Sequence, residues 1–584
     1  MESRPATVPG RAAFGLLALG LLLVTPLAFS RGFSDQFTYV KHLLTQGLVL
    51  TGTTAFALTL VWGRRRWPRN SRLSLPLALL ALAVVISSLA SPLPEFSLRE
   101  AGYFLCGPLW LGLLTAWGGG EAWVRRRAAL ITIAGAGVAA IAVLQWTGYD
   151  PLLFGGFHVE WGTMRASMRL YSTFGNPNLV AGYLIGAVFL ALALAASSAT
   201  LPGRILGAAG VLVIFAAILG TRSRGAWLGL AAGLLVARRF WARKTGEAVP
   251  ATGGSGNTAT LLAGLLPAGL LLLLPNLAQQ ARALLSHLEG RSYLWRASWP
   301  MFTEHPLLGS GWGTFQLRFP ELQAQFLSLH PEYVRYWTHT RQLHNDPLQI
   351  LLEAGALGIG AFGWLLWTYG RDLRQVNTHA SRTERLWLAA SAGGVTAILV
   401  NSLFNFQLAV APTLILLFTL VAFPQMLRTC GEEVAEAGAA GKLTVVFRSC
   451  ATALVLAAAV FLAFGIVRRA LAEHSLAVGL DAERRGDLVA AEQHFRTGLV
   501  RSPDDGSSHY GLARALFAHG QLPEALAEAL RAERTVADPH LEVLKARIQD
   551  QMGWRSPALE AYRHAMWLNP TLKSVPADIE RLSK

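Results

Sequence analysis

Residues 178–198 read NLVAGYLIGAVFLALALAASS and contain no charged side chain. An apolar run of about twenty residues is the length that an α-helix needs to cross a hydrocarbon core of about 30 Å. Such runs recur along the chain, and the sequence therefore predicts an all-α, polytopic transmembrane bundle of about 12–13 helices. The predicted spans have these approximate limits: 12–30, 42–63, 73–91, 101–118, 128–147, 178–198, 204–220, 225–238, 259–276, 345–369, 386–408, 411–427 and 445–467.

The composition supports a membrane protein and argues against a nucleic-acid-binding protein. Hydrophobic residues make up 53% of the 584 residues, charged residues make up 15%, and the formal net charge is +16. A nucleic-acid-binding protein gathers Lys and Arg on one soluble face, whereas here they cluster in short loops between the apolar runs. The three cysteines have no CxxC spacing, so neither a metal site nor a disulfide framework is indicated.

The basic loops predict the orientation of the chain in the cytoplasmic (inner) membrane. Arginine-rich loops at 64–66, 125–127, 238–244 and 371–385 alternate as an inside N-terminus requires. The first apolar run lacks a clean small-x-small cleavage site, which favours a retained helix over a cleaved signal sequence. Thirteen crossings place the C-terminus outside the cytoplasm, and one span fewer would place it inside.

A repeat begins after about residue 470, where no further membrane-length run occurs. Gly486, Gly520 and Gly553 are 34 and 33 residues apart. This period, with small residues where paired helices cross, resembles tetratricopeptide repeats, in which each helix hairpin buries its apolar face against the next. We therefore expect a membrane domain at 1–467 and a soluble α-helical repeat domain at 468–584. Further residues that keep the period are Ala491, Ala525 and Ala558, and Phe495, Ala529 and Tyr562.

The first candidate site residues are two arginines in a very short outward turn. Arg222 and Arg224 belong to the stretch TRSRGAW and lie where the positive-inside pattern disfavours basic residues. One interpretation is that they anchor the helix ends at the membrane interface. The other is that they bind an anion, because guanidinium groups match phosphate oxygens with two parallel hydrogen bonds.

Two outward loops, 148–177 and 277–344, hold the remaining candidates. The shorter loop ends in RLYSTFGNPN, in which Arg169 can join the arginines, Asn176 begins a turn and Asn178 is expected to cap the next helix. The long loop contains Arg291 and Trp295, followed by the glycine-rich stretch HPLLGSGWG. Glycines permit tight backbone turns close to a ligand.

The long loop ends in HNDPLQ at the mouth of the span that begins near residue 345. A lone histidine is more often structural, but His344 stands among polar residues and can accept a proton near neutral pH. Asp346 lies two residues on and can orient its ring. If His344 is a general base, activity should rise with pH through a pKa near the usual value of about 6.5.

Together TRSRGAW, the R-x-x-x-W…HPLLGSGWG loop and HNDPLQ…E-x-G resemble the O-antigen ligase and polymerase superfamily, over about residues 10–430. The resemblance implies transfer of a glycan from undecaprenyl pyrophosphate to an acceptor on the outer side of the cytoplasmic membrane, without metal or cofactor. It implies catalytic roles for His344, Arg222 and Arg224. Arg291 matches an arginine of the family's large periplasmic loop. The other candidate substrate-binding residues come from their places in the outward loops and are Arg169, Asn176, Trp295, Asn345 and Asp346.

The acceptor remains open at this level, because the thirteenth span and the repeats depart from the basic ligase pattern. A ligase or O-oligosaccharyltransferase would transfer a finished glycan to a lipid or protein acceptor. The repeats favour that alternative, since such arrays mostly bind polypeptide, either as acceptor or as assembly partner. A polymerase would join carrier-linked units, and a transporter or flippase is a third alternative. No paired, glycine- or proline-broken helices of the kind that mark transport sites are evident.

Overall fold

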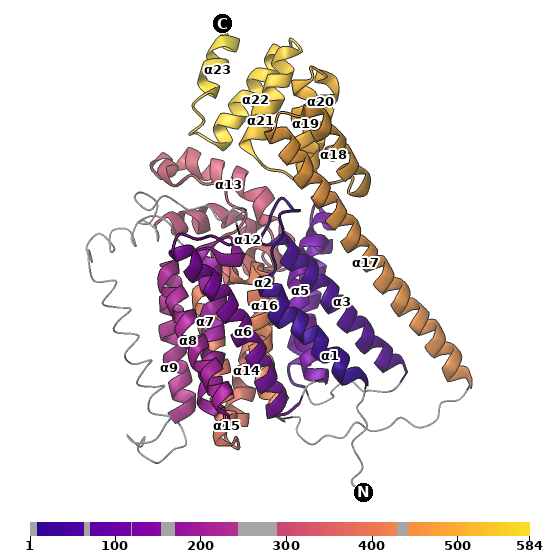
Figure 1. The fold of residues 1–584 in the computed structure, drawn as a ribbon. Helices are drawn as coiled ribbons and strands as arrows, with labels where there is room; N and C mark the ends of the chain where they lie inside the picture. Colours follow the sequence, from indigo (N-terminus) through magenta and orange to yellow (C-terminus); the bar gives the residue numbers. More distant parts are fainter. Residues whose placement is uncertain (1–8, 63–70, 118, 153–169, 243–288, 429–441) are drawn as a thin grey trace, which may run out of the picture.

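The computed structural model describes residues 9–62, 71–117, 119–152, 170–242, 289–428 and 442–584, and the regular elements in these ranges are helices (Figure 1). The all-α prediction is thus confirmed. Seven of the described helices are long and apolar enough to cross a membrane, and Ala12–Leu27 and Ser74–Leu89 are shorter apolar helices. The chain is an integral membrane protein. The predicted span 259–276 lies outside the described residues.

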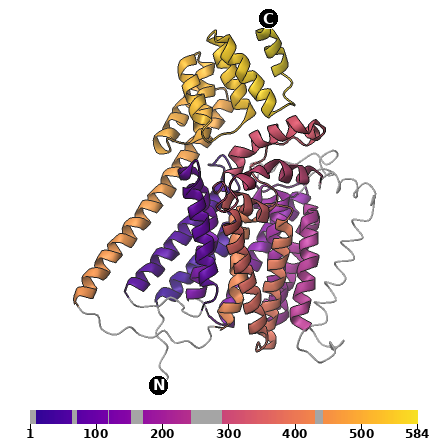
Figure 2. The same ribbon diagram turned by 180° about the vertical axis from the view of Figure 1, so that it is seen from behind.

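The membrane bundle is built from helices that pack side by side, with loops at its two ends (Figures 1 and 2). A first, interrupted helix runs through α1, a π-helical turn and α2. The helices of the bundle are α1 (Pro9–Leu19), η1 (Gly20–Val24), α2 (Thr25–Leu27), α3 (Tyr39–Val61), α4 (Ser74–Leu89), α5 (Pro94–Trp117), α6 (Glu121–Trp146), α7 (Pro177–Ser197), α8 (Leu201–Thr221), α9 (Arg224–Ala242), α14 (Asp346–Asn377), α15 (Arg382–Ser402), α16 (Ala411–Arg428) and α17 (Lys442–Arg484).

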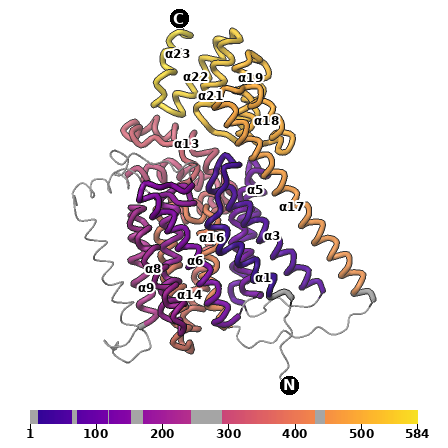
Figure 3. The backbone as a smooth tube through the Cα atoms, in the orientation of Figure 1, coloured from indigo at the N-terminus to yellow at the C-terminus, as the bar shows by residue number. Residues whose placement is uncertain are grey.

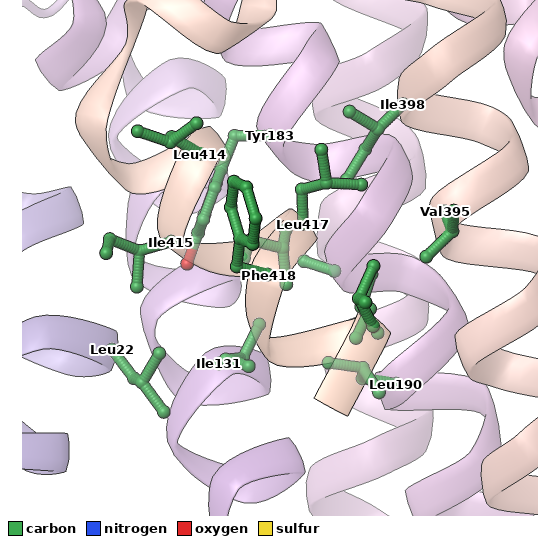
Figure 4. Packing of buried hydrophobic residues seen from close by; sticks show 14 of the residues in the cluster. Leu22, Ile131, Tyr183, Leu190, Val395, Ile398, Leu414, Ile415, Leu417 and Phe418 are labelled. Carbon is green, nitrogen blue, oxygen red and sulfur yellow. The ribbon is translucent and has the colours of Figure 1, made fainter. Parts of the chain in front are cut away.

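Helices α7 and α16 form the centre of the bundle. In their most apolar windows 83% and 94% of the residues are buried inside the protein. Figure 4 shows Tyr183 of α7 close to Leu414 and Phe418 of α16. A Cβ on Gly186 would lie only 2.8 Å from side-chain atoms of Ile398 and Leu416, so this glycine lets the neighbouring helices approach. Small residues at such crossings are how helices pack in a membrane.

Helix α17 differs from the central helices, because none of its most apolar window is buried inside the protein. It packs on α3 and continues without a break into the first helical pair of the repeats (Figure 3). The soluble helices that follow are α18 (Leu488–Arg501), α19 (Gly506–Ala518), α20 (Leu522–Ala532), α21 (Pro539–Gln551), α22 (Arg555–Leu568) and α23 (Val575–Ser583).

The residues that suggested the repeat occupy equivalent places in three helical pairs. Gly486, Gly520 and Gly553 turn α17 into α18, α19 into α20 and α21 into α22, with φ of 81°, 76° and 77°. These left-handed values favour glycine. The periodic alanines at 491, 525 and 558 are fully buried in the helical pairs. The predicted helical-repeat architecture is therefore present.

The repeat domain lies against one end of the bundle, beside α12 (Pro300–Glu304), α13 (Phe315–Leu329) and the 3₁₀ turn η3 (Pro331–Tyr336) (Figure 1). Trp337 Nε1 donates to the carbonyl of Leu568 at 2.9 Å, and Trp567 Nε1 donates to Ser328 Oγ at 3.1 Å. The helices α12 and α13 therefore lie between the bundle and the repeats at this end of the molecule (Figure 1).

Candidate active site

The HNDPLQ stretch forms the start of α14. His344 adopts a left-handed φ of 56°, and the Oδ1 atom of Asn345 accepts a hydrogen bond from the backbone N–H of Leu348 at 3.0 Å. Asn345 is thus the N-cap of α14, the position where an asparagine side chain satisfies a free N–H. The Gln349 side chain accepts from the N–H of Leu343 at 3.1 Å. These two bonds fix the backbone on both sides of His344.

Asp346 has a different partner from the one that the sequence suggested. Its carboxylate is buried and accepts a hydrogen bond from the backbone N–H of Leu408 at 3.1 Å, in the connection between α15 and α16. No hydrogen bond between Asp346 and His344 occurs among the described residues. The expectation that Asp346 orients the histidine is therefore not met, because the helix start directs the carboxylate toward that connection.

Helix α14 is broken at Gly355, where φ is 65° and ψ is −168°. The broken turn leaves backbone groups that a continuous helix would have paired, and the HPLLGSGWG loop pairs with them. The N–H of Ala356 donates to Pro306 at 2.9 Å, and the N–H of Ser310 donates to Leu352 at 3.0 Å. Irregular backbone at membrane depth is tolerated where protein groups satisfy it in this way.

The glycines of the HPLLGSGWG loop are needed for packing against the bundle. A Cβ on Gly309 would lie 2.3 Å from the backbone of Glu353, and a Cβ on Gly311 would lie 2.4 Å from the Ser91 side chain. Glu353 strengthens the contact between this loop and α14, because its carboxylate accepts from the N–H of Phe315 at 3.2 Å and from Gln349 Nε2 at 3.3 Å. Sequence analysis did not select Glu353 as a site residue, although it lies in the E-x-G stretch.

The two arginines of TRSRGAW occupy the turn between α8 and α9. Arg222 ends α8 with a left-handed φ of 52°, Arg224 is the first residue of α9, and both side chains are exposed. Gly225 lets this turn pack on α15, since a Cβ there would lie 2.7 Å from Asn401 Oδ1 and 3.0 Å from Asn405 Nδ2.

Arg291 and His344 lie next to each other, beside two aromatic rings of the connection between α15 and α16. The Arg291 guanidinium lies 5.8 Å from the ring centre of Phe404, and the His344 ring meets Phe406 edge-to-face at 5.0 Å. Neither phenylalanine could be predicted from the sequence, since nothing in the stretch SLFNF distinguishes a site from an apolar loop. The two rings shield the arginine and the histidine from water.

The electrostatics of this group couple Arg224, Arg291 and His344. Burial, together with the nearby charge of Arg224, lowers the pKa of Arg291. Burial and the charge of Arg291 lower the pKa of His344 to about 4. No carboxylate forms an ion pair with Arg224 or Arg291 within the described ranges. The histidine is therefore neutral at physiological pH and lies close to Arg291, which has no counter-ion among the described residues.

The other predicted site residues have structural contacts. Trp295 Nε1 donates to the carbonyl of Leu343 at 3.3 Å and so supports the residue before His344. Asn176, rather than the expected Asn178, caps α7 by accepting from the N–H of Asn178 at 2.9 Å. Proline at 177 fits the first turn that follows such a cap. Arg169 lies outside the described residues.

A cavity of about 890 Å³ lies on the other side of His344. His344 and Asn176 line it, together with residues of α3, α5, the long loop and the repeats. Asp346 lines it as well, whereas the candidates Arg222, Arg224, Arg291, Trp295 and Asn345 do not. Among the described residues, no three or more His, Cys, Asp or Glu side chains come together as a metal site would need.

Comparison with known families identifies two regions of the chain. The O-antigen ligase family matches residues 209–363, and the tetratricopeptide repeat matches residues 482–548. No curated protein matches the chain. The first match contains the arginine turn, Arg291, the glycine-rich loop and His344. The protein therefore carries an O-antigen ligase domain followed by tetratricopeptide repeats, which implies a membrane enzyme that transfers lipid-linked glycans as ligases or polymerases do.

Proposed function

We propose that the protein transfers a glycan from undecaprenyl pyrophosphate to an acceptor hydroxyl on the outer side of the cytoplasmic membrane. The observation that carries this proposal is the placement of Arg291 beside a neutral His344 and of Arg224 close to Arg291, with no carboxylate paired to either arginine in the described part of the chain. An unpaired cationic pair suits a pyrophosphate leaving group. A neutral imidazole suits a proton acceptor.

In the proposed reaction, the acceptor oxygen attacks the anomeric carbon opposite the pyrophosphate. The new carbon–oxygen bond forms as the bond to pyrophosphate breaks, which inverts the anomeric configuration. The pyrophosphate leaves with the bonding electron pair, and Arg291, Arg224 and Arg222 stabilise its growing charge. The hydroxyl proton moves to His344. All charges and atoms balance without a metal ion or cofactor.

The same arrangement links donor binding to the basicity of His344. In the free enzyme, burial and, to a smaller extent, the charge of Arg291 hold the pKa of His344 well below its ordinary value. A bound pyrophosphate neutralises that charge, because opposite charges at short range stabilise each other. The pKa of His344 therefore rises when the donor is bound. The histidine becomes a better base at the step where a base is needed.

We propose the ligase or O-oligosaccharyltransferase reaction rather than polymerisation. The cavity beside His344 is bounded by the repeats as well as by the membrane domain, which supports a distinct acceptor rather than a second carrier-linked unit. The site residues and the repeats belong, in this proposal, to the outer side of the membrane, with the domains dividing at about 467. Reporter tags at 250 and 378 should then be cytoplasmic, and tags at 320 and 584 should be outside.

The activity can be tested with purified protein in lipid nanodiscs, a carrier-linked glycan and candidate lipid and protein acceptors. We expect one glycan per acceptor and release of undecaprenyl pyrophosphate, with both lost in the His344→Ala variant. Laddered growth on the carrier would instead establish a polymerase. Inhibition by EDTA that a divalent ion reverses would overturn the metal-free mechanism. Donor consumption that does not differ between wild type and His344→Ala would overturn the proposed function as a whole.

A further inference from the structure

The cavity beside His344 is formed jointly by the membrane domain and the repeats. Tyr103 and Arg99 of α5 line one side, and Trp312 of the long loop lines another. Arg469 of α17 and Tyr510 of α19 close it from the repeat side. The ring of Trp312 packs against Phe104 at 4.4 Å between centroids, so this aromatic part of the wall is held in place. A ligand in the cavity would touch both domains at once.

The repeats present one particular face to the cavity. The repeat residues that line it come from the end of α17, from α19 and the turn before it, and from residues 535–538 before α21. These are the first helices of the helical pairs or the segments that lead into them. Described residues of the second helices, α18, α20 and α22, do not line the cavity. Stacked first helices form the extended binding surface of a repeat array.

Hydrogen bonds fix the repeats at two separate places around the cavity. Near the first pair, Glu473 accepts from the N–H of Ser34 at 3.2 Å, and His474 Nδ1 lies 2.9 Å from the carbonyl of Gly32. Near the third pair, the bonds of Trp337 and Trp567 described above join the repeats to the long loop. The repeat domain is thus placed as a wall of the cavity and is more than a tethered appendage.

The charges of the cavity distinguish possible acceptors. Four arginines line it, but Arg99 lies 3.4 Å from Glu100 and Arg514 lies 2.6 Å from Glu483, so two already have carboxylate partners. Seven carboxylate side chains line the same cavity, in a chain whose formal net charge is +16. Glu100 is the partner of Arg99, and Asp346 and Glu353 are buried and accept from backbone N–H groups. A phosphorylated lipid acceptor would meet the other four carboxylates, and like charges brought together discriminate against a partner. The seven are Asp35, Glu100, Asp346, Glu353, Glu473, Asp505 and Asp538.

The aromatic and arginine side chains favour a polypeptide. Tyr, Trp, Phe and Arg are the residue types enriched where proteins contact one another. The cavity presents Tyr39, Tyr103, Trp312 and Tyr510 together with the four arginines. A volume of about 890 Å³ is within the range of sites that enclose a compact ligand. It suits a short segment of a chain that continues along the repeat surface.

We infer that this cavity is the acceptor site and that its occupant is a polypeptide segment bearing a serine or threonine hydroxyl, held between α5, the long loop and the first helices of the repeats. The inference rests on the proposed function. The donor pyrophosphate occupies the arginine side of His344, and the polypeptide hydroxyl reaches the histidine from the cavity side. Tyr510 and Arg469 are then acceptor-binding residues, although they lie far from His344 in sequence.

The test places a photo-crosslinking amino acid at Ser507, which is exposed and lines the cavity. The matched control carries it at Val500, which is 81% exposed on α18 and does not line the cavity. Each full-length protein is irradiated in membranes of cells that make the carrier-linked glycan, and the adducts are analysed by mass spectrometry. We expect a glycan-bearing serine or threonine peptide at 507 and none at 500. With His344→Ala added, the adduct at 507 should lose its glycan.

Two outcomes would overturn the inference. A lipid or carbohydrate adduct at 507 without peptide would replace the polypeptide by a lipid or glycan acceptor. Equal peptide yields at 507 and 500, or no adduct at 507, would remove the cavity as the acceptor site. Carrier-linked donor is measured in the same membranes without irradiation. Donor consumption that depends on His344 would show that only the inference has failed, and consumption that does not depend on it would show that the proposed function has failed.

Discussion

The two sides of His344 differ in charge. On one side Arg291 and Arg224 have no ion-pair carboxylate among the described residues; the charge of Arg224 acts on Arg291, and that of Arg291 acts on the histidine. On the other side the cavity mixes arginines with seven carboxylates and aromatic rings. A site for a leaving pyrophosphate must keep its cations free, whereas a site for a neutral hydroxyl compound gains selectivity from mixed polar contacts. In the proposed reaction, the arginine side therefore receives the pyrophosphate and the cavity side receives the acceptor.

Removing the histidine between the two sides should have the largest effect. We expect His344→Ala to lower the transfer rate about 10²–10⁴-fold, the usual contribution of a positioned acid or base. Donor binding should persist, because the arginines remain. His344→Gln keeps a hydrogen-bonding group but cannot take up the proton. Single-turnover kinetics with labelled donor would measure both effects, and a Gln variant as fast as wild type would mean that His344 only orients the acceptor.

Removing either arginine should also slow transfer. We expect Arg224→Ala or Arg291→Ala to lower the transfer rate about 10²–10³-fold, the usual effect of losing one hydrogen-bond donor that is already oriented toward a developing negative charge. Lysine should restore little, since a point charge does not reproduce the two-pronged guanidinium contact. Arg296→Ala is the matched control and should keep its activity. Arg296 is exposed on the same helical stretch as Arg291 and donates to the Tyr333 hydroxyl at 3.0 Å. Full activity in the Arg224→Lys, Arg291→Lys double variant would contradict bidentate phosphate binding.

Removing the Glu353 carboxylate, which holds the HPLLGSGWG loop against α14, should lower the stability of the protein more than the transfer rate. Glu353→Ala leaves the N–H of Phe315 and the amide of Gln349 without their acceptor in a buried place, at a cost of about 1–3 kcal/mol. Thermal unfolding in nanodiscs would show a lower midpoint. Glu353→Gln, which keeps an acceptor oxygen, should recover most of the loss. An unchanged midpoint in the Ala variant would show that the carboxylate does not hold the loop.

The smallest expected effect is a displacement of the acid limb of the pH profile. In the free enzyme the pKa of His344 is lowered to about 4. Its neutral form therefore persists well below pH 6.5 and is lost only as the pH falls toward about 4. Arg291→Gln removes one of the two causes, and the pKa should rise part of the way back toward its ordinary value. The acid limb of kcat/KM should then move to higher pH in the variant. An identical limb in both proteins would mean that another group titrates.

The pH prediction from sequence alone was therefore too simple. An unperturbed histidine would give a limb near pH 6.5. The structure surrounds His344 with Phe406 and Arg291, and both the burial and the positive charge favour the neutral ring. Neither neighbour could be assigned from spacing, because Phe406 and Arg291 are far from residue 344 along the chain.

The sequence by itself determined the membrane class, most helices and the repeat. Twenty-residue apolar runs and a period of 33–34 residues are local patterns, and each helix or helical pair forms largely from its own residues. The sequence also made Arg222 and Arg224 candidates, because two arginines in an outward turn depart from the positive-inside pattern. His344 became a candidate from its polar surroundings at the mouth of a span, and Arg291 from the family resemblance. Nearness in sequence also made Asp346 the expected partner of His344, and that partnership is absent from the described structure.

Only the tertiary structure decided which contacts those residues make. Asp346 accepts from the N–H of Leu408, Glu353 accepts from the N–H of Phe315, and His344 packs on Phe406. These contacts form because the broken helix α14, the glycine-rich loop and the connection between α15 and α16 meet at one end of the bundle. The cavity likewise exists only where α5, the long loop and the repeats converge. Contacts between segments that are tens to hundreds of residues apart depend on how the helices pack, and no local period in the sequence records that packing.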